Sequence, residues 1–392
     1  MEEKKVPKLR FKGFVQEWEQ RKFFDNIKST IDFRGRTPKK LGMDWSDSGY
    51  LALSALNVRN GYIDPSTDAH YGDQELYDKW MTGKDLYKGQ VLFTTEAPMG
   101  NVAQVPDNNK YILSQRTIAF DVNSDKITDD FLAVLLRSPK SFNELSSLAS
   151  GGTAKGVSQK SLSHFKVTLP NNLEEQNKIG TFFNQLDDTI ALHQRKIEQL
   201  KLLKQAFLQK MLANQENVPE LRFADFDVYW EQHTLGETTD IRAGRDYKHL
   251  KSGNIPVYGT GGYMLSVDDA LSFDKDAIGI GRKGTIDNPY ILKAPFWTVD
   301  TLFYVIPRNG NEIDFFYSVF QKINWKSKDE STGVPSLSKS TINSILVYAP
   351  SKDEQKKIGT FFKYFDENIL IHQHKVNLLK KLKKAFLQKL FI

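Results

Sequence analysis

The chain of 392 residues contains no cysteine. This absence excludes a disulfide framework and any thiolate metal site, and it favours a reducing compartment such as the cytoplasm. The sequence also has no apolar run of about 20 residues, which a membrane-spanning helix would need. Its first residues, MEEKKVPKLRFKGF, are charged and no apolar stretch follows them, so they do not resemble a secretory signal. We therefore expect a cytoplasmic protein that does not enter a membrane.

Motifs of common catalytic sites are missing as well. The sequence has no GxxxxGK[ST] loop, no HExxH pattern and no evident Ser/His/Asp grouping. The stretch YGTGGY at 258–263 lacks the lysine of a phosphate-binding loop, so we interpret it as a tight turn between strands. DNPY at 287–290 lacks the second proline of the Asn-Pro-Pro-aromatic signature of amino-methyltransferases, and no glycine-rich cofactor loop precedes it. We predict that the chain is not an enzyme and has no metal site.

Length and composition indicate a folded protein with more than one domain. A single hydrophobic core rarely serves 392 residues. The hydrophobic share of 40% and the charged share of 26% are those of globular rather than disordered chains. A formal net charge of +6 and a pI of about 9.0 favour an anionic partner.

A long internal repeat dominates the chain. Residues 174–212 and 353–391 align without a gap, and 22 of the 39 positions are identical. Each copy has an apolar stripe with steps of three and four residues, as a helix seam requires. The first stripe consists of Ile179, Phe182, Leu186, Ile190, His193, Ile197, Leu200, Leu203, Phe207 and Met211. The second consists of Ile358, Phe361, Phe365, Ile369, His372, Val376, Leu379, Leu382, Phe386 and Leu390.

These stripes predict two long helices that pair as an intramolecular antiparallel coiled coil. Its expected core is formed by Ile190, His193, Ile197, Leu200, Phe207, Ile369, His372, Val376, Leu379 and Phe386. A helix of 39 residues would be about 58 Å long. His193 and His372 occupy equivalent positions, and we expect them to fix the register of the helix pair rather than to bind a metal.

The segments before the helices repeat more loosely. PKLRFKGFVQEWEQ at 7–20 returns as PELRFADFDVYWEQ at 219–232, and the first half holds roughly 30 residues that the second lacks. We therefore divide the chain into a first domain, a helix, a second domain and a helix, with boundaries at 1–172, 173–213, 214–351 and 352–392. The helices agree closely while the domains agree only in framework, which suggests one spacer joined to two divergent reading domains.

Within the domains, short strands alternate with Gly, Pro and Asn, and one helix comes late in each. We predict strands at 89–95, 117–122, 277–281 and 301–306, and helices at 127–139 and 313–323. This pattern favours an α+β fold with a mainly antiparallel sheet in both domains.

The repeated element EEQNKIGTFFNQLDDTI…LKQAFLQK, with its twin DEQKKIGTFFKYFDENI…LKKAFLQK, resembles the conserved regions of type I restriction-modification specificity subunits. GRTP (35–38), VLFTTEAPMGNVA (91–103), IPVYGTGGY (255–263) and GRKGTIDN…PFWTVDTLF (281–303) are similar to segments of that family's target-recognition domains. The resemblance covers essentially the whole chain.

The resemblance implies a non-catalytic reader of double-stranded DNA. Each domain would read one half of a bipartite target, and the helix pair would set the spacing. Two modification (methyltransferase) subunits would dock on this chain, with restriction (translocase/endonuclease) subunits in the full complex. Those partners, and not this chain, would bind S-adenosylmethionine, ATP and Mg²⁺.

Basic loops are the expected DNA contacts, because cations on Gly-containing loops suit phosphates and Arg suits guanine. We predict that Arg36, Thr37, Lys39 and Lys40 of the first domain and Arg245, Lys248, Arg282 and Lys283 of the second contact DNA. Residues expected to reach base edges are Asn57, Arg59, Gln115 and Arg116, with Tyr258 and Thr260 in the second domain. Two alternatives stay open: a stand-alone DNA methyltransferase or nuclease, and a coiled-coil adaptor that binds only proteins.

Overall fold

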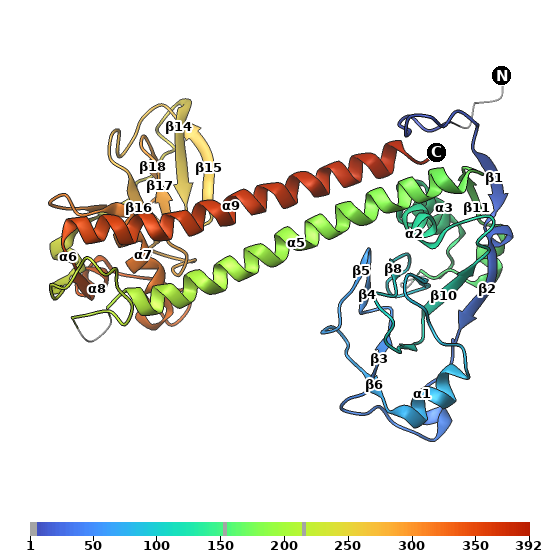
Figure 1. Cartoon of the computed structure of the whole chain (residues 1–392). Helices are drawn as coiled ribbons and strands as arrows, with labels where there is room; N and C mark the ends of the chain where they lie inside the picture. The colour runs from blue at the N-terminus through green and yellow to red at the C-terminus, as the bar shows by residue number, and fades with distance from the viewer. Residues whose placement is uncertain (1–5, 152–154, 214–216) are drawn as a thin grey trace. The chain divides into compact units, whose positions relative to one another are not determined.

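The computed structural model describes residues 6–151, 155–213 and 217–392, and it divides the chain into two compact units. The first unit comprises the chain up to Leu192 together with Lys375–Ile392, and the second comprises His193–His374. Two long helices, α5 (Leu173–Met211) and α9 (Lys352–Lys389), are each divided between the units, with one part of the helix in the first unit and the other part in the second (Figure 1). Across the described ranges, no helix has the length and apolar character needed to cross a membrane.

The first unit contains a four-stranded antiparallel sheet and a smaller mixed one. The larger sheet has the order β2 (Ile27–Asp32), β10 (Thr117–Val122), β7 (Val91–Thr94) and β8 (Val102–Gln104). The smaller has the order β6 (Tyr71–Gly72), β3 (Tyr50–Leu53) and β9 (Ile112–Leu113), with β3 and β9 parallel. Further elements are β1 (Glu19–Lys22) paired with β11 (Lys166–Leu169), the hairpin β4 (Val58–Arg59) and β5 (Tyr62–Ile63), and the helices α1 (Gln74–Met81), α2 (Asp129–Arg137), α3 (Pro139–Leu148) and α4 (Gln159–His164).

The second unit repeats this plan. Its larger sheet has the order β13 (Thr239–Ala243), β19 (Leu302–Pro307), β16 (Ala277–Gly281) and β17 (Tyr290–Leu292). Its smaller sheet has the order β15 (Gly262–Val267), β14 (Ser252–Gly259) and β18 (Trp297–Thr298), again with one parallel pair. β12 (Glu231–Thr234) pairs with β20 (Leu346–Ala349), and the helices are α6 (Leu235–Thr238), α7 (Ile313–Lys322) and α8 (Lys339–Asn343). The hairpin β4–β5 and helix α1 have no counterpart in the described part of this unit.

The predicted fold class is confirmed. Both units are α+β with mainly antiparallel sheets, and the strands predicted at 117–122 and 277–281 are β10 and β16 residue for residue. The other two predicted strands and both predicted helices are present with ends shifted by a few residues. The turn predicted within YGTGGY is also present, because Gly259 pairs with Gly262 across Thr260 and Gly261.

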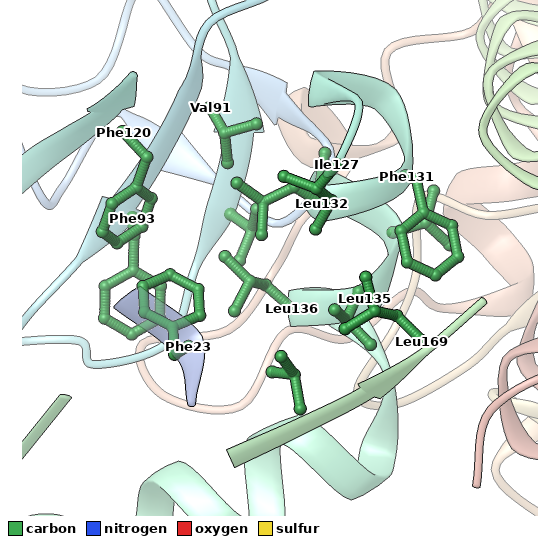
Figure 2. Close-up of a cluster of buried hydrophobic side chains, with 14 of the residues drawn as sticks. Phe23, Val91, Phe93, Phe120, Ile127, Phe131, Leu132, Leu135, Leu136 and Leu169 are labelled. Carbon is green, nitrogen blue, oxygen red and sulfur yellow. The ribbon is translucent and has the colours of Figure 1, made fainter. Parts of the chain in front are cut away.

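Helix α2 connects the first sheet to α5. Thr128 caps the helix by accepting a hydrogen bond from the Phe131 amide, and the six apolar residues from Phe131 to Leu136 are then buried in the core. In Figure 2, Leu136 of α2 lies toward Phe93 and Phe23, whereas Phe131 and Leu135 lie beside Leu169, and all of them belong to one core. Ile179 and Phe183 of α5 are buried in the same core. The first half of α5 is therefore part of the domain and not a free linker.

The two long helices run antiparallel within each unit, and the contacts repeat between equivalent residues. In the first unit the rings of Phe182 and Phe386 lie 5.1 Å apart, and Lys383 donates a hydrogen bond to Asp187. In the second unit the equivalent rings, Phe207 and Phe361, lie 5.2 Å apart, and Lys204 donates to Asp366. The predicted antiparallel coiled coil is confirmed.

The predicted stripes need one correction. Ile190, Ile197, Leu200 and Val376 are buried, whereas Leu203 and Leu382 are exposed by 48% and 40%. Lys204 and Lys383 take the inward positions instead. The step from Leu200 to Lys204 is a full helical turn, so it stays on the seam, and a lysine can bury its apolar stem while its amine reaches a partner. Burial lowers the pKa of the Lys204 ammonium, and the hydrogen bond to Asp366 opposes that effect.

The remaining predicted core residues, Phe207, Ile369, Leu379, Phe386 and the two histidines, are half-buried. His193 and His372 meet across the helix pair in the second unit, where their Nδ1 atoms are 2.8 Å apart. One ring must donate and the other accept, so a single shared proton joins the two helices at this level.

The repeated segments 7–20 and 219–232 contact the ends of the long helices. Arg10 forms a two-point ion pair with Glu175 near the start of α5, with nitrogen–oxygen distances of 2.6 and 2.7 Å, and the Glu175 side chain is 1% exposed. Arg222 binds Glu354 of α9 in the same way. The Leu9 and Leu221 amides donate to the last turns of α9 and α5, so the repeated segment caps one helix and clamps the other.

We expect Asp366→Ala to destabilise the protein more than Lys204→Met. The first change leaves a buried ammonium without its counter-charge, at about 3 kcal/mol, whereas the second replaces that ammonium with an apolar chain of similar length at about 1 kcal/mol or less. Calorimetry should show the unfolding temperature of Asp366→Ala lower by roughly 6–10 °C.

The control is Glu174→Ala, which removes an exposed 2.8 Å pair with Lys178 and should change little. The Asp366→Ala deficit should shrink as the pH approaches 10. The folded pKa of Lys204 lies below its unfolded value, so the unfolded state binds more protons and stability rises with pH. Equal losses in both seam variants would contradict a buried ion pair.

Candidate nucleic-acid interface

The predicted DNA-contacting residues of the first unit gather at one edge of its sheets. β10 runs antiparallel to both β2 and β7, with Ile118 opposite Asp32 and Thr117 opposite Thr94. The C-terminal ends of β2 and β7 therefore meet the N-terminal end of β10. Strand β9 ends three residues before β10 begins, at Leu113, so its end lies at this edge too. We call this the strand-end edge.

Arg36 and Gln115 are brought together at the strand-end edge. The Arg36 guanidinium donates to the Trp80 carbonyl and lies 4.4 Å from the centre of the Phe33 ring. The Gln115 side-chain amide donates to the Arg36 carbonyl. Both side chains are half-buried and have partners within the domain, so they hold the loop that follows β2. Their contact with DNA stays a prediction.

Thr37, Lys39 and Lys40 form a short turn on that loop. Thr37 caps the 3-10 helix Pro38–Leu41, and its hydroxyl accepts from the Lys40 amide at 3.2 Å. The Lys40 ammonium donates to the Gly35 carbonyl at 2.7 Å. Lys39 and Lys40 are exposed, so this turn presents two positive charges to solvent.

Arg116 lies directly before β10 in a left-handed backbone conformation, with a φ of 65°. Its carbonyl accepts two hydrogen bonds from Thr95, one from the amide at 2.8 Å and one from the hydroxyl at 3.2 Å. Its Nε is 2.9 Å from an Oε1 of Glu96, and both side chains are about half exposed. Glu96 was not among the predicted site residues, although it lies within the quoted segment 91–103.

Asn57 requires a correction. Its side chain is fully buried, with Nδ2 donating to the Ala52 carbonyl at 2.7 Å and Oδ1 accepting from the Ser54 amide at 2.9 Å. Both ends of the amide are occupied inside the domain, so we withdraw Asn57 as a base contact. Arg59 ends β4, is half-buried and faces Tyr62 across the hairpin.

The second unit forms an equivalent strand-end edge. The Arg245 amide donates to the Thr298 carbonyl at 2.8 Å, and the Val299 amide donates to the Tyr258 carbonyl at 3.0 Å. The ends of β13, β14 and β18 therefore meet where β19 begins. Tyr258 is half-buried, with the ring of Tyr263 6.3 Å away.

The hairpin β14–β15 touches the loop after β16. A Cβ placed on Gly284 would lie 3.9 Å from the Thr260 hydroxyl. The Tyr290 hydroxyl donates to the Gly259 carbonyl at 2.6 Å, and burial raises the pKa of this hydroxyl. Thr260 thus lies beside the loop that carries Arg282 and Lys283.

Arg282 and Lys283 are exposed at this edge. The Arg282 guanidinium donates to the Asp300 carbonyl at 3.3 Å and lies 5.9 Å from the Phe303 ring centre. Lys248 is exposed between β13 and β14.

The structure adds Arg242, which lines an open cavity of about 580 Å³ with Arg245 and Tyr304. A hydrogen bond to Asp240 raises the pKa of the Arg242 guanidinium. Arg242 lies in β13, three residues before the predicted contact Arg245, so sequence reasoning could have included it.

These observations define a class of protein: two copies of one α+β domain, each with cations at its strand-end edge and each joined to a long helix. The family model described as "Type I restriction modification DNA specificity domain" matches residues 16–202 and 227–381. The two matches span most of the chain, and the chain belongs to this family.

Known relatives agree with this family. The chain is 23% identical over 407 residues to the putative type I restriction enzyme MjaX specificity subunit of Methanocaldococcus jannaschii, covering 95% of this chain and 92% of that protein. It is 29% identical over 124 residues to the MjaIX specificity subunit of the same organism, which covers 31% of this chain and 29% of that protein.

Solved structures show the same fold. The type I restriction-modification S subunit from M. genitalium matches with a TM-score of 0.72 at 18% identity, covering 99% of both chains. A chain from a study of complex assembly in the type I R-M system matches with a TM-score of 0.51 at 16% identity, covering 94% of this chain and 96% of that one.

We expect Asn57→Ala to destabilise the first unit without changing base preference. The change leaves a buried amide and a buried carbonyl without partners, at about 1–3 kcal/mol. Calorimetry should show the unfolding temperature lowered by several degrees. Asn108→Ala, at an exposed asparagine of the same domain, serves as the control. An unchanged unfolding temperature together with altered DNA selectivity would restore Asn57 as a reader.

Proposed function

We propose that this chain is the DNA-recognition subunit of a type I restriction-modification complex and that each unit reads one half of a bipartite double-stranded target. One observation carries the proposal: the same strand-end edge occurs in both units, with exposed cations on a backbone held by hydrogen bonds, while the side chains differ. A shared frame with different side chains is what two readers of different sequences require.

The helix pair is the proposed spacer. α5 and α9 retain 22 identical positions of 39, whereas the domains share only their framework. Residues of the seam must match one another to pack, and residues at the edges must differ to read different bases. We infer that the helices set the distance between the two half-sites.

In this proposal the chain does no chemistry. Modification subunits supply the S-adenosylmethionine site and methyl transfer, and restriction subunits supply ATP, Mg²⁺ and cleavage. The family membership supports this division of labour.

Selection of random duplex DNA tests the reading function. The chain is tagged and purified from its native host with the subunits that accompany it. We expect two short fixed blocks separated by an unspecified gap of constant length. A single continuous block would mean that only one unit reads DNA, and no enrichment would favour the protein-only adaptor. Methyl transfer from labelled S-adenosylmethionine by the isolated chain would revive the stand-alone methyltransferase.

The outer faces of the long helices are the proposed docking surfaces for modification subunits. Leu192 and Leu382 of the first unit are exposed by 58% and 40%, and their sequence equivalents, Ile371 and Leu203 of the second unit, by 50% and 48%. Apolar side chains repeated at equivalent exposed positions are expected of two equivalent protein contacts. Each surface would hold one modification subunit.

We expect the double variant Leu192→Glu/Leu382→Glu to lower the number of copurified modification subunits from two to one per chain, because charge at an apolar contact opposes burial. Ile371→Glu/Leu203→Glu should do the same through the second unit. Native mass spectrometry measures the ratio. Val15→Glu, at a valine that is 87% exposed elsewhere in the first unit, is the control. A ratio that stays at two in both double variants would place docking elsewhere.

A further inference from the structure

Arg116 has a backbone conformation that arginine rarely adopts. A φ of 65° places the residue in the left-handed region, which is uncommon for residues other than glycine and costs on the order of 1 kcal/mol relative to ordinary conformations. The two hydrogen bonds from Thr95 to the Arg116 carbonyl hold it there. Backbone of this kind, with the side chain directed outward, is typical of functional positions.

Glu96 is also held in place. Its backbone forms a bridge with Gly156, and the neighbouring Thr95 carbonyl accepts from the Val157 amide at 2.9 Å. A Cβ on Gly156 would lie 3.1 Å from the Cβ of Glu96, so the glycine allows the two segments to approach closely. Both partners of the Arg116–Glu96 pair therefore extend from a fixed backbone.

The fold has little need of this pair. The side chains of Arg116 and Glu96 are 53% and 43% exposed, and ion pairs at such sites contribute between 0 and about 1 kcal/mol. Of the other predicted base contacts of the first unit, the Gln115 amide binds the Arg36 carbonyl and Asn57 is buried. Arg59 is half-buried on the β4–β5 hairpin. Arg116 is a predicted base contact whose guanidinium is exposed to solvent and is held in one orientation by Glu96.

We propose that Arg116, positioned by Glu96, reads a guanine in the major groove of the first half-site. This inference rests on the proposed function and names the base that the first unit recognises. Arg116 uses its Nε toward Glu96, which leaves the terminal nitrogens for a second planar partner. Guanine presents two acceptors, O6 and N7, at the spacing of an arginine fork, and no other base presents that pair.

Glu96 has two tasks in this arrangement. It fixes the plane of the guanidinium before DNA arrives, which reduces the side-chain entropy lost on binding. It also places a negative charge beside the reading position, which repels phosphates, so Arg116 is kept from binding the DNA backbone non-specifically. Glu96 is thus a positioning residue and Arg116 the residue that contacts the base.

The second unit has a different arrangement at the equivalent position. There the Arg282 amide donates to the Thr301 carbonyl at 2.8 Å, just as the Thr95 amide donates to the Arg116 carbonyl, so Thr301 takes the place of Arg116. Lys283, whose backbone bridges to Ser336, takes the place of Glu96. The proposed guanine reader therefore belongs to the first unit alone, and its loss should leave the half-site of the second unit unchanged.

The test repeats the DNA selection with the complex purified through the tagged full chain, in the forms wild type, Arg116→Lys and Glu96→Gln. Wild type should select a guanine at one position of one block. Arg116→Lys should lower that preference about tenfold or more, because lysine lacks the fork, and Glu96→Gln should lower it less. The other block should not change in either variant. The control is Glu75→Gln, which removes an exposed 2.7 Å pair with Lys79 on α1 and should select the wild-type motif.

A second measurement uses the selected duplex with that guanine replaced by 7-deazaguanine, which loses only the N7 acceptor. We expect wild type to bind it about tenfold more weakly. Arg116→Met, whose side chain has no hydrogen-bond donor, should bind both duplexes within twofold. Calorimetry should show the unfolding temperatures of the Arg116 and Glu96 variants within about 1 °C of wild type, since the ion pair is exposed.

Two outcomes overturn the inference by itself: a wild-type target with two blocks but no guanine that depends on Arg116, or a 7-deazaguanine effect of equal size in wild type and Arg116→Met. The absence of any fixed block in the wild-type selection would instead remove the proposed function, and this inference with it.

Discussion

The structure depends on the way each long helix covers the apolar stripe of its own sequence duplicate. Because the two helices run in opposite directions, one set of contacts serves both units: Phe182 against Phe386 in the first and Phe207 against Phe361 in the second. The seam lysines follow the same rule, Lys383 with Asp187 and Lys204 with Asp366. A change on one helix therefore alters a contact that the other helix must match, which explains why the two copies have stayed alike.

The domains are fixed to the helices by contacts of the same repeated kind. Buried Glu175 and Glu354 bind Arg10 and Arg222, and the start of each helix lies in the core of one domain, as Ile179 does. Glycine marks the closest approach: a Cβ on Gly180 would come within 2.6 Å of Asp130. With the sheet held so firmly against the helix, the strand-end edge can vary in side chains without losing its position. The same packing therefore accounts for the frame that the two units share and for the edge at which their side chains differ.

Much of this could be predicted from the chain itself, and the failures are informative. Helical spacing identified the seam, but the inward place of Lys204 instead of Leu203 depends on an acceptor, Asp366, that lies 162 residues away. The residue type of Asn57 suggested a base contact, yet its side-chain amide is hydrogen-bonded to the backbone of Ala52 and Ser54. Glu96 was overlooked because a carboxylate on a basic surface has no local signature. Each failure concerns the partner of a polar group, and sequence periodicity reports only burial.

The duplication, the two long helices, the α+β class of the domains and the family resemblance could all be recognised from the residues alone. These properties follow from composition, periodicity and self-similarity, which are local or internal to the chain. The folded arrangement was needed to distinguish the cations that remain exposed from those engaged inside the domain. It also decided that the ends of β2, β7 and β10 meet at one edge. The physical reason is that hydrogen bonds and ion pairs are formed between segments distant in sequence, and their partners are chosen by the packing of the sheets.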